Sequence, residues 1–221
     1  ETGRNAPLKK VAAAKTGNML ELNLLLVAML RYAGLQADPV MLSTREHGYS
    51  LVDFPVTGQF NYLVCRVRAD EDDWLLDATH PLLGFGKLPY QCYNGQARVL
   101  NREATLIRLS ADQLNESDNM QVEISLDKSG SPQWQSIVNH QYGFFASELV
   151  RKKVKKEGTE ALQKALEVEE KVGGTLSELV FPPSDKPGSL LEVKYKLTTA
   201  ATEDGMLYVT PVLVSYFRQN P

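Results

Sequence analysis

The feature that most constrains the fold is a long, almost uninterrupted apolar run near the start of the chain, from Leu22 to Leu35. Asn18 is a good helix N-cap, and Glu21 follows it at the three-residue spacing of a capping box. Apolar residues recur at helical spacing through the run, and Gly34 stands where a helix commonly ends. The sequence therefore predicts a helix that is apolar nearly all round, which is typical of a central, buried element.

A strand is expected at residues 60–68, because its side chains alternate between the two faces of an extended backbone. Tyr62 shares one face with Val64, whereas Cys65 points to the opposite face. Further strands are predicted at 39–44 and 73–77. A helix followed by antiparallel strands is typical of an α+β fold.

The 221-residue chain is predicted to divide near residue 110 into two domains, 1–110 and 111–221. The second domain is expected to be a mostly antiparallel β domain with a helical insertion at about 142–172. Its patterns predict strands at 120–126, 133–140, 175–181, 190–199 and 206–215, and helices at 144–156 and 159–172.

Charge and composition exclude several classes of function. A net charge of −3 gives no global basic field, so nucleic acid is not a favoured partner. No transmembrane segment is expected, because Glu21 and Arg31 interrupt the longest apolar stretch. The three histidines, at positions 47, 80 and 140, lack metal-ligand spacing, and neither a metal nor a cofactor is predicted.

The two cysteines say little about the redox compartment. Cys65 lies in a predicted strand, where a buried thiol is the simplest interpretation. Cys92 precedes a turn signal. A disulfide between them stays open, because the sequence does not give the geometry that such a bond requires.

Three short segments carry polar residues at the ends of predicted elements: Gly17-Asn18-Met19 opens the predicted helix, Phe60-Asn61-Tyr62 begins the strand, and Leu76-Asp77-Ala78-Thr79 ends the next strand. These segments resemble the active-site blocks of the bacterial transglutaminase-like (papain-like) superfamily. Family members carry a cysteine, a histidine and an aspartate at the positions of Met19, Tyr62 and Asp77. The resemblance therefore implies a degenerate catalytic triad in which the aspartate alone remains.

The chain is most similar to an envelope branch of this family from Bacteroidetes-type bacteria. The resemblance implies a papain/transglutaminase-like core, a central helix on an antiparallel sheet, followed by part of an uncharacterised β-rich domain. It also implies a periplasmic, cell-surface or secreted location. The opening Glu1-Thr2-Gly3 resembles a cloning or signal-cleavage remnant, and we expect the native chain to continue beyond Asn220-Pro221.

Acyl-transfer chemistry is not expected at the three triad positions. A methionine thioether has no proton to lose, and tyrosine, with a reference pKa of about 10, is a poor general base at neutral pH. Met19 and Tyr62 therefore supply neither nucleophile nor base, which predicts a pseudoenzyme. Asp77 is expected to accept hydrogen bonds from Tyr62 or from backbone N–H groups, because an unpaired buried carboxylate is costly.

Three hypotheses for function follow. The first is a binding module whose cleft, lined by Met19, Tyr62 and Trp74, holds a cell-envelope peptide or glycan; ordinary core packing is the alternative for these residues. The second is a structural or assembly module that contacts other domains of a larger multidomain envelope protein. The third is a hydrolase or acyltransferase that uses non-family residues, such as His80 beside Asp77.

Overall fold

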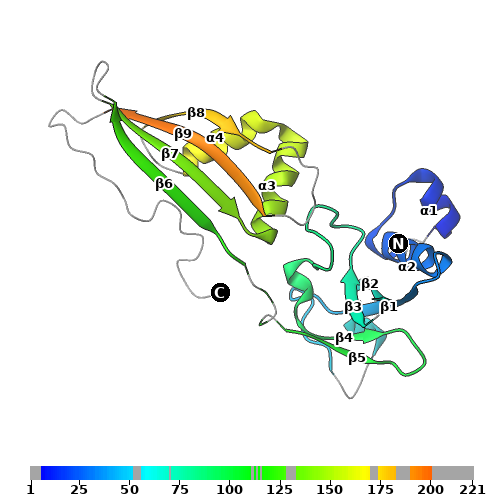
Figure 1. Cartoon of the computed structure of the whole chain (residues 1–221). Helices are drawn as coiled ribbons and strands as arrows, with labels where there is room; N and C mark the ends of the chain where they lie inside the picture. Colours follow the sequence, from blue (N-terminus) through cyan, green and yellow to red (C-terminus); the bar gives the residue numbers. More distant parts are fainter. Residues whose placement is uncertain are drawn as a thin grey trace. The chain divides into compact units, whose positions relative to one another are not determined.

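The structure is a computed structural model that describes residues 6–51, 56–69, 71–110, 112, 114, 116–127, 133–169, 174–182 and 190–200. The chain forms two compact units, Glu1–Asn115 and Glu116–Pro221 (Figure 1). The predicted boundary at residue 110 falls within the last residues of the first unit. The described residues form helices and two antiparallel sheets, joined by loops, so the predicted α+β class is confirmed. The papain-like core stays a prediction.

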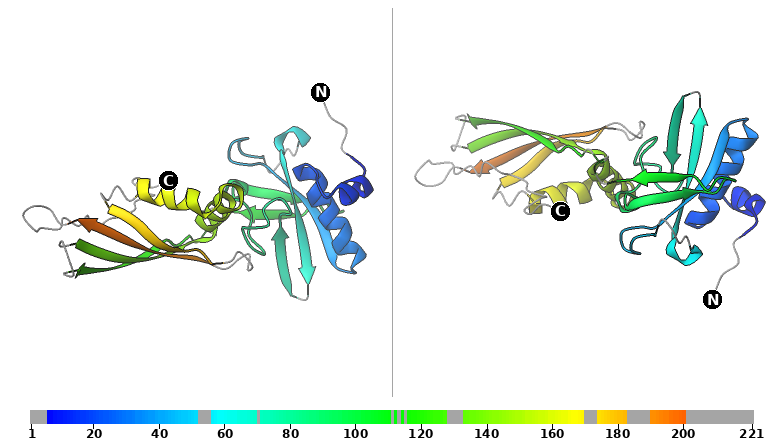
Figure 2. Two further views of the ribbon diagram at one scale, coloured as in Figure 1. Left: turned by 90° about the horizontal axis from the view of Figure 1, so that it is seen from above. Right: turned by 90° about the horizontal axis from the view of Figure 1, so that it is seen from below.

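The first unit begins with two helices, α1 (Leu8–Ala14) and α2 (Met19–Tyr32), which lie next to each other in both views of Figure 2. The predicted capping box of α2 is confirmed, because the Asn18 side chain accepts from the Glu21 N–H and the Glu21 carboxylate accepts from the Asn18 N–H. Gly34 follows the helix with φ +86°, a left-handed conformation that glycine adopts without strain.

Five antiparallel strands form the sheet of this unit, in the order β3-β2-β1-β4-β5. Two single-turn 3-10 helices, η1 and η2, lie in the connections. The bounds of these elements are β1 (Gln36–Leu42), η1 (Thr57–Gln59), β2 (Tyr62–Ala69), β3 (Asp72–Leu76), η2 (Tyr90–Cys92), β4 (Gly95–Val99) and β5 (Leu106–Leu109).

Side chains on the two faces of β2 enter two different hydrophobic clusters. One cluster joins Cys65 to Val27 of α2, so the helix covers this face of the sheet. The other cluster contains Val64 and Cys92, and Tyr62 packs against it. The predicted separation of Tyr62 and Cys65 onto opposite faces is therefore confirmed.

The prediction that α2 is a central, buried element is wrong for one side of the helix. Met29 is 60% exposed and Tyr32 is 96% exposed. The sheet covers one side of α2 and α1 packs beside it, but the described residues leave another side of the helix in contact with solvent. An apolar helix predicts burial only where a second layer is present to cover it.

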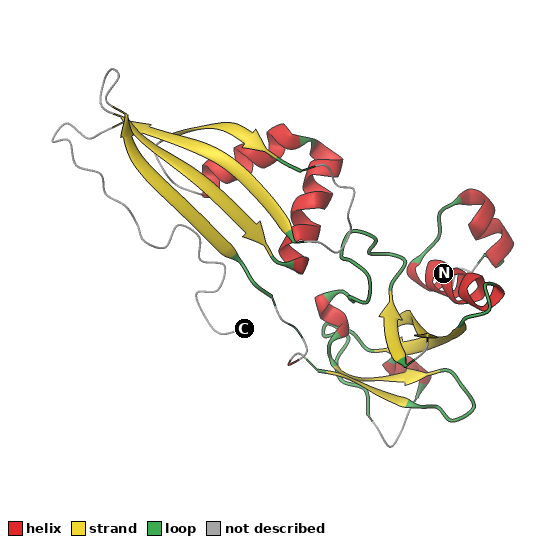
Figure 3. Ribbon diagram, in the orientation of Figure 1, coloured by secondary structure: helices red, strands yellow, loops and turns green. Residues whose placement is uncertain are grey.

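The second unit is a four-stranded antiparallel sheet in the order β6-β7-β9-β8, with both helices on one face (Figure 3). Apolar side chains of the two central strands, β7 (Gln133–Tyr142) and β9 (Leu191–Ala200), pack with Leu162 and Leu166 of helix α4 (Thr159–Glu169) to form a single core. The predicted strand at 206–215 lies outside the described residues. The elements are β6 (Asn119–Asp127), β7 (Gln133–Tyr142), α3 (Phe144–Glu157), α4 (Thr159–Glu169), β8 (Gly174–Val180) and β9 (Leu191–Ala200).

Candidate functional site

The N-terminus of α2 fixes the position of Met19. Met19 is the first residue of the helix and follows the Asn18 cap directly. The backbone N–H groups of Ala6 and Asn18 donate to the Glu21 carboxylate and hold its pKa below the usual value. The carboxylate thus ties the segment before α2 to the first helical turn, so that the backbone around Met19 is well defined.

The thioether of Met19 contacts the start of β2. Its Sδ atom accepts a hydrogen bond from the backbone N–H of Leu63 at 3.2 Å. Because Leu63 follows Tyr62 in the chain, this contact brings the first residue of α2 close to the first residue of β2. Two of the three predicted triad positions therefore lie at neighbouring points of the structure.

The phenol of Tyr62 is bonded to the predicted aspartate. Its hydroxyl donates to Oδ2 of Asp77 at 2.7 Å and lies 3.1 Å from the hydroxyl of Thr79. Burial, together with the hydrogen bond to Asp77, raises the pKa of Tyr62 well above its usual value of 10. Tyr62 therefore keeps its proton at neutral pH and acts as a donor, not as a base.

Asp77 is the centre of this hydrogen-bond network. Its second oxygen, Oδ1, accepts from the side-chain amide of Asn23 at 3.0 Å, and from the backbone N–H and the hydroxyl of Thr79 at 2.8 and 2.6 Å. With the bond from Tyr62, the half-buried carboxylate has four donors. The prediction that Asp77 bonds to Tyr62 and to backbone N–H groups is confirmed.

Asn23 belongs to the site, although the sequence reasoning missed it. This fully buried side chain also accepts a hydrogen bond from the backbone N–H of Ala78 at 2.9 Å, so it links α2 to the turn after β3. The available signal was a lone amide in an apolar helix, four residues after Met19 and therefore on the same helix face. We name the residues Met19, Asn23, Tyr62, Asp77 and Thr79 the Asp77 cluster.

Trp74, the third predicted ligand-binding residue, is not brought to the Asp77 cluster. In the β2–β3 register Trp74 lies opposite Val67, which is five residues from Tyr62 and therefore on the other face of the sheet. Its ring packs against Phe85, with the ring centroids 5.1 Å apart. We therefore leave Trp74 out of the candidate site.

Both thiols are free and buried. Burial raises the pKa of Cys65 to about 11. Burial and the charge of Asp77 raise the pKa of Cys92 to about 12. Both side chains are protonated at neutral pH, and a protonated thiol is a poor nucleophile. The possible disulfide between Cys65 and Cys92 is absent.

His80 contacts Asp77 through the backbone: its N–H donates to the Asp77 carbonyl oxygen at 3.4 Å. The hydrogen bonds given above for the Asp77 carboxylate come from a phenol, an amide, a hydroxyl and a backbone N–H. The hydrolase hypothesis, which would use His80 beside Asp77, stays a prediction.

Two exposed tyrosines and an exposed arginine lie on the connections from β1 to β2 and from β3 to β4. We define Arg45, Tyr49 and Tyr90 as the aromatic rim. Tyr90 belongs to η2, and Cys92 of the same turn packs in the hydrophobic cluster that Tyr62 joins. The guanidinium carbon of Arg45 lies 4.8 Å from the centroid of the Tyr90 ring, a distance typical of a cation–π contact. Tyr90 and Tyr49 are both exposed.

Buried polar residues hold the rim loop in place. The side chain of Asn94 donates to the carbonyl of Gly48 at 2.9 Å, and the Ser43 hydroxyl donates to the same carbonyl at 2.6 Å. The Arg45 backbone N–H donates to the carbonyl of Gln91 at 3.0 Å. The rim side chains therefore stand on an ordered backbone, which reduces the entropy lost when a ligand binds.

Within the described residues, no group of three or more histidine, cysteine, aspartate or glutamate side chains is placed to hold a metal ion. In the same part of the chain, no helix is long and apolar enough to cross a membrane. Comparison of the chain with protein-family models, with curated proteins and with solved structures finds no match.

Proposed function

We propose that this chain is a catalytically inactive transglutaminase-like protein that serves as a binding module in the bacterial cell envelope. One observation supports the proposal: the Met19 Sδ atom accepts from the backbone N–H of Leu63, the neighbour of Tyr62, and the Tyr62 hydroxyl donates to Asp77. In an active enzyme of the resembled family, a thiol, a base and an orienting acid would occupy the positions of Met19, Tyr62 and Asp77. The side chains present there bond to Leu63 and to one another. Acyl transfer requires a nucleophile and a base, and this site has neither.

The aromatic rim supports a role in binding. Tyr49 and Tyr90 offer exposed rings with polar ends, and Arg45 adds a guanidinium group with donors for carbonyl or carboxylate oxygens. Aromatic rings beside a few polar groups suit a peptide or a glycan. The half-buried phenol of Tyr62 would form the floor of such a site. The envelope location and the class of ligand follow from the family resemblance.

A thermal-shift screen tests the binding proposal. The probes are peptidoglycan fragments, short peptides and oligosaccharides, each present at a large excess over the protein. A ligand at 100 times its dissociation constant adds about 2.7 kcal/mol of stability, which is a readily measured rise in Tm. We expect a shift that the Tyr62→Ala and Tyr90→Ala variants reduce and that the control Leu149→Ala, at an exposed residue of α3, keeps. The absence of a shift with every probe would contradict the binding role.

The alternative, a structural or assembly module of a larger envelope protein, has one observation in its favour. Large apolar side chains of α2 are exposed, above all Met29 and Tyr32. A contiguous apolar patch on a folded unit would favour contact with another protein.

A further inference from the structure

The sheet of the second unit has a long, regular strand at one edge. This strand is β6, and among the described residues its positions 119–126 have a neighbouring strand, β7, on one side only (Figure 1). The register with β7 is continuous. β6 contains neither proline nor lysine, the residues that commonly discourage pairing at an edge. Its outward backbone groups can therefore accept a further strand.

The apolar side chains of β6 are only partly covered. Met120 and Val122 pack against the core of the unit. Ile124 and Leu126 point to the same face of the sheet, because side chains alternate along a strand, yet they are 41% and 38% exposed. Apolar residues that share the core face and remain exposed at an edge mark the place where a neighbouring strand would complete the core.

The opposite edge of the sheet, β8, is less suited to a further strand. Its register with β9 shifts between Ser177 and Val180, and Glu178 within this irregularity has φ +53°, a left-handed conformation. The side chain of Gln163, from α4, donates to the Leu176 carbonyl at 3.2 Å. Both features interrupt a regular row of pairing groups, so β6 is the edge that offers the longer regular template.

A segment of the same chain has a sequence that fits this edge. The predicted strand at 206–215 lies outside the described residues and reads Met-Leu-Tyr-Val-Thr-Pro-Val-Leu-Val-Ser, which is rich in residues that favour strands. It is about as long as β6. Pro211 has no backbone N–H, and a proline inside a strand is tolerated at the edge of a sheet, where no donor is needed on the outer side.

The direction and reach of the chain also favour β6. Because β9 is paired with β7 and β8, a strand that follows it must add at an edge. A segment that returns from the end of β9 is antiparallel to β6 and parallel to β8, and antiparallel pairing is slightly more stable. Ala200 lies in one row with Gln133 and Asp127. The new position is three strand spacings from β9, about 14 Å, and the connection at 201–205 can span about 20 Å.

We propose that residues 206–215 pair with the free edge of β6 as a further antiparallel strand of the sheet. Apolar side chains of this segment would cover Ile124 and Leu126, and the pairing would close the β6 edge to strands of other molecules. The inference concerns the second unit and does not depend on ligand binding at the Asp77 cluster, so the two proposals can fail separately.

Hydrogen exchange in the full chain tests whether the β6 edge is occupied. In an edge strand, alternate backbone N–H groups bond to the neighbouring strand and the others face solvent. A strand with a partner on each side is protected at consecutive residues. We expect slow exchange at consecutive residues from 120 to 126, measured by NMR. Protection at alternate residues only would show an open edge and would overturn the proposal.

Disulfide cross-linking in the full chain identifies the occupant of the edge. Ser125→Cys is combined with a single cysteine at each position from 206 to 210. Thr175→Cys with the same partners is the matched control, because Ser125 and Thr175 are exposed at the two ends of one row across the sheet. We expect Ser125→Cys to form intramolecular disulfides at alternate positions, at least about tenfold faster than Thr175→Cys does. The native cysteines are buried in the first unit.

Three results of the cross-linking scan would overturn the proposal. Faster cross-linking from Thr175→Cys would assign the segment to the β8 edge. Disulfide-linked dimers in place of the intramolecular bond would assign the β6 edge to a second copy of the chain. Equal cross-linking from Ser125→Cys at every position, or none in variants whose circular dichroism matches that of the parent, would show that the segment forms no strand beside β6.

Discussion

At the scale of single residues, the Asp77 carboxylate holds the candidate site together. It accepts hydrogen bonds from Tyr62, Asn23 and Thr79, which come from a strand, a helix and a turn. A half-buried carboxylate needs such donors, because hydrogen bonds replace the lost solvation. Asp77 thus has a structural role that does not depend on catalysis.

Removing the Tyr62 hydroxyl should destabilise the first unit. Tyr62→Phe deletes the 2.7 Å donor to Asp77 and leaves one carboxylate oxygen less well satisfied, so we expect a loss of about 1–3 kcal/mol. Urea unfolding is monitored by the fluorescence of Trp74 in a Trp134→Phe background, so that the signal reports on this unit alone. The control Tyr90→Phe, at an exposed ring, should stay within about 0.5 kcal/mol of the parent. Equal effects of the two changes would contradict the network.

Replacing the Asn23 amide by a carboxylate should make stability depend on pH. Asn23→Asp places a second carboxylate about 3 Å from Asp77, and this repulsion raises the folded-state pKa of one of the two acids. A raised folded pKa lowers stability at pH values above the unfolded pKa of about 4, and protonation removes the penalty. The difference in unfolding free energy from the parent should therefore be largest at pH 7 and shrink toward pH 4. A constant difference would contradict the contact.

Sequence reasoning reached part of this network. The Tyr62–Asp77 bond was predictable, because both residues lie in recognisable segments and the carboxylate needs a donor. Asn23 was hidden in an apolar run, and the strand register puts Trp74 on the face of the sheet opposite to Tyr62. The sequence alone showed neither placement, because the β2–β3 register and the rotation of α2 come from long-range packing.

At the scale of secondary-structure elements, long and strongly patterned segments were predicted well. The structure places α2, β2, β7 and α3 close to their predicted ranges. The elements that were missed are short: α1, β4 and β5 have seven, five and four residues. Such lengths give a periodic pattern too few repeats to stand out. Formation of α1 depends on packing on α2, and formation of β4 and β5 depends on pairing with β1 and β4, respectively.

The first turn of α3 depends on a carboxylate supplied from outside the helix. The backbone N–H groups of Phe145 and Ala146 donate to the Glu116 carboxylate at 3.2 Å. The N-cap residue, Gly143, has no side chain that could accept these hydrogen bonds. A Cβ at Gly143 would collide with that carboxylate and lie 2.6 Å from the Ser117 carbonyl oxygen. Gly143→Ala should therefore cost about 1–3 kcal/mol through steric strain and the lost cap.

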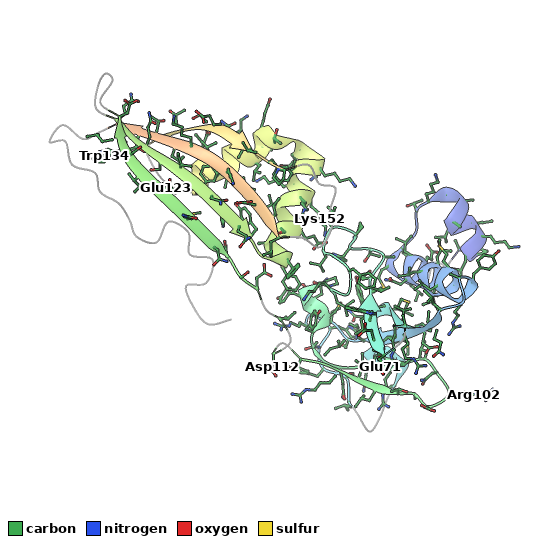
Figure 4. The ribbon with its side chains drawn as sticks, viewed as in Figure 1. Glu71, Arg102, Asp112, Glu123, Trp134 and Lys152 are labelled. Carbon is green, nitrogen blue, oxygen red and sulfur yellow. The ribbon has the colours of Figure 1, made fainter. Side chains whose placement is uncertain are left out.

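A double-mutant cycle separates the loss of the Glu116 cap from other effects of replacing a glycine by alanine. Unfolding of the second unit, followed by Trp134 fluorescence, should show that Gly143→Ala costs less in a Glu116→Ala background, because the cap is already absent. Trp134 is a suitable reporter because it lies on β7 of this unit (Figure 4). Gly58→Ala is the control, since its Cβ would meet no atom within 4 Å. Fully additive effects would argue against the cap.

At the scale of the whole molecule, the chain consists of two units with separate cores. Val40 and Val64 belong to a core of the first unit, and Val138 and Val193 to the core of the second. The polar stretch near residue 110 indicated a boundary, but the contacts place it after Asn115. Composition marks where a connection is polar, whereas the point of separation depends on which residues pack with which core.

Each unit should fold when it is expressed alone. Fragments 1–115 and 116–221 both keep their described sheets and cores intact, so each should show dispersed amide resonances in NMR and a cooperative urea transition. A fragment that stayed unfolded alone and folded only when mixed with the other would show that the two cores depend on each other.

We propose that Met19, Tyr62 and Asp77 keep the geometry of a thiol active site without its chemistry. The measurement that tests it most directly is the pH dependence of iodoacetamide alkylation in Met19→Cys and in Met19→Cys/Tyr62→His. The native thiols interfere little near neutral pH, because burial raises the pKa of Cys65 to about 11 and, with the charge of Asp77, that of Cys92 to about 12. An imidazole held beside the new thiol should lower its pKa well below the reference of about 8.5, and below the value in the single variant. The same thiol pKa in both variants would contradict the claim.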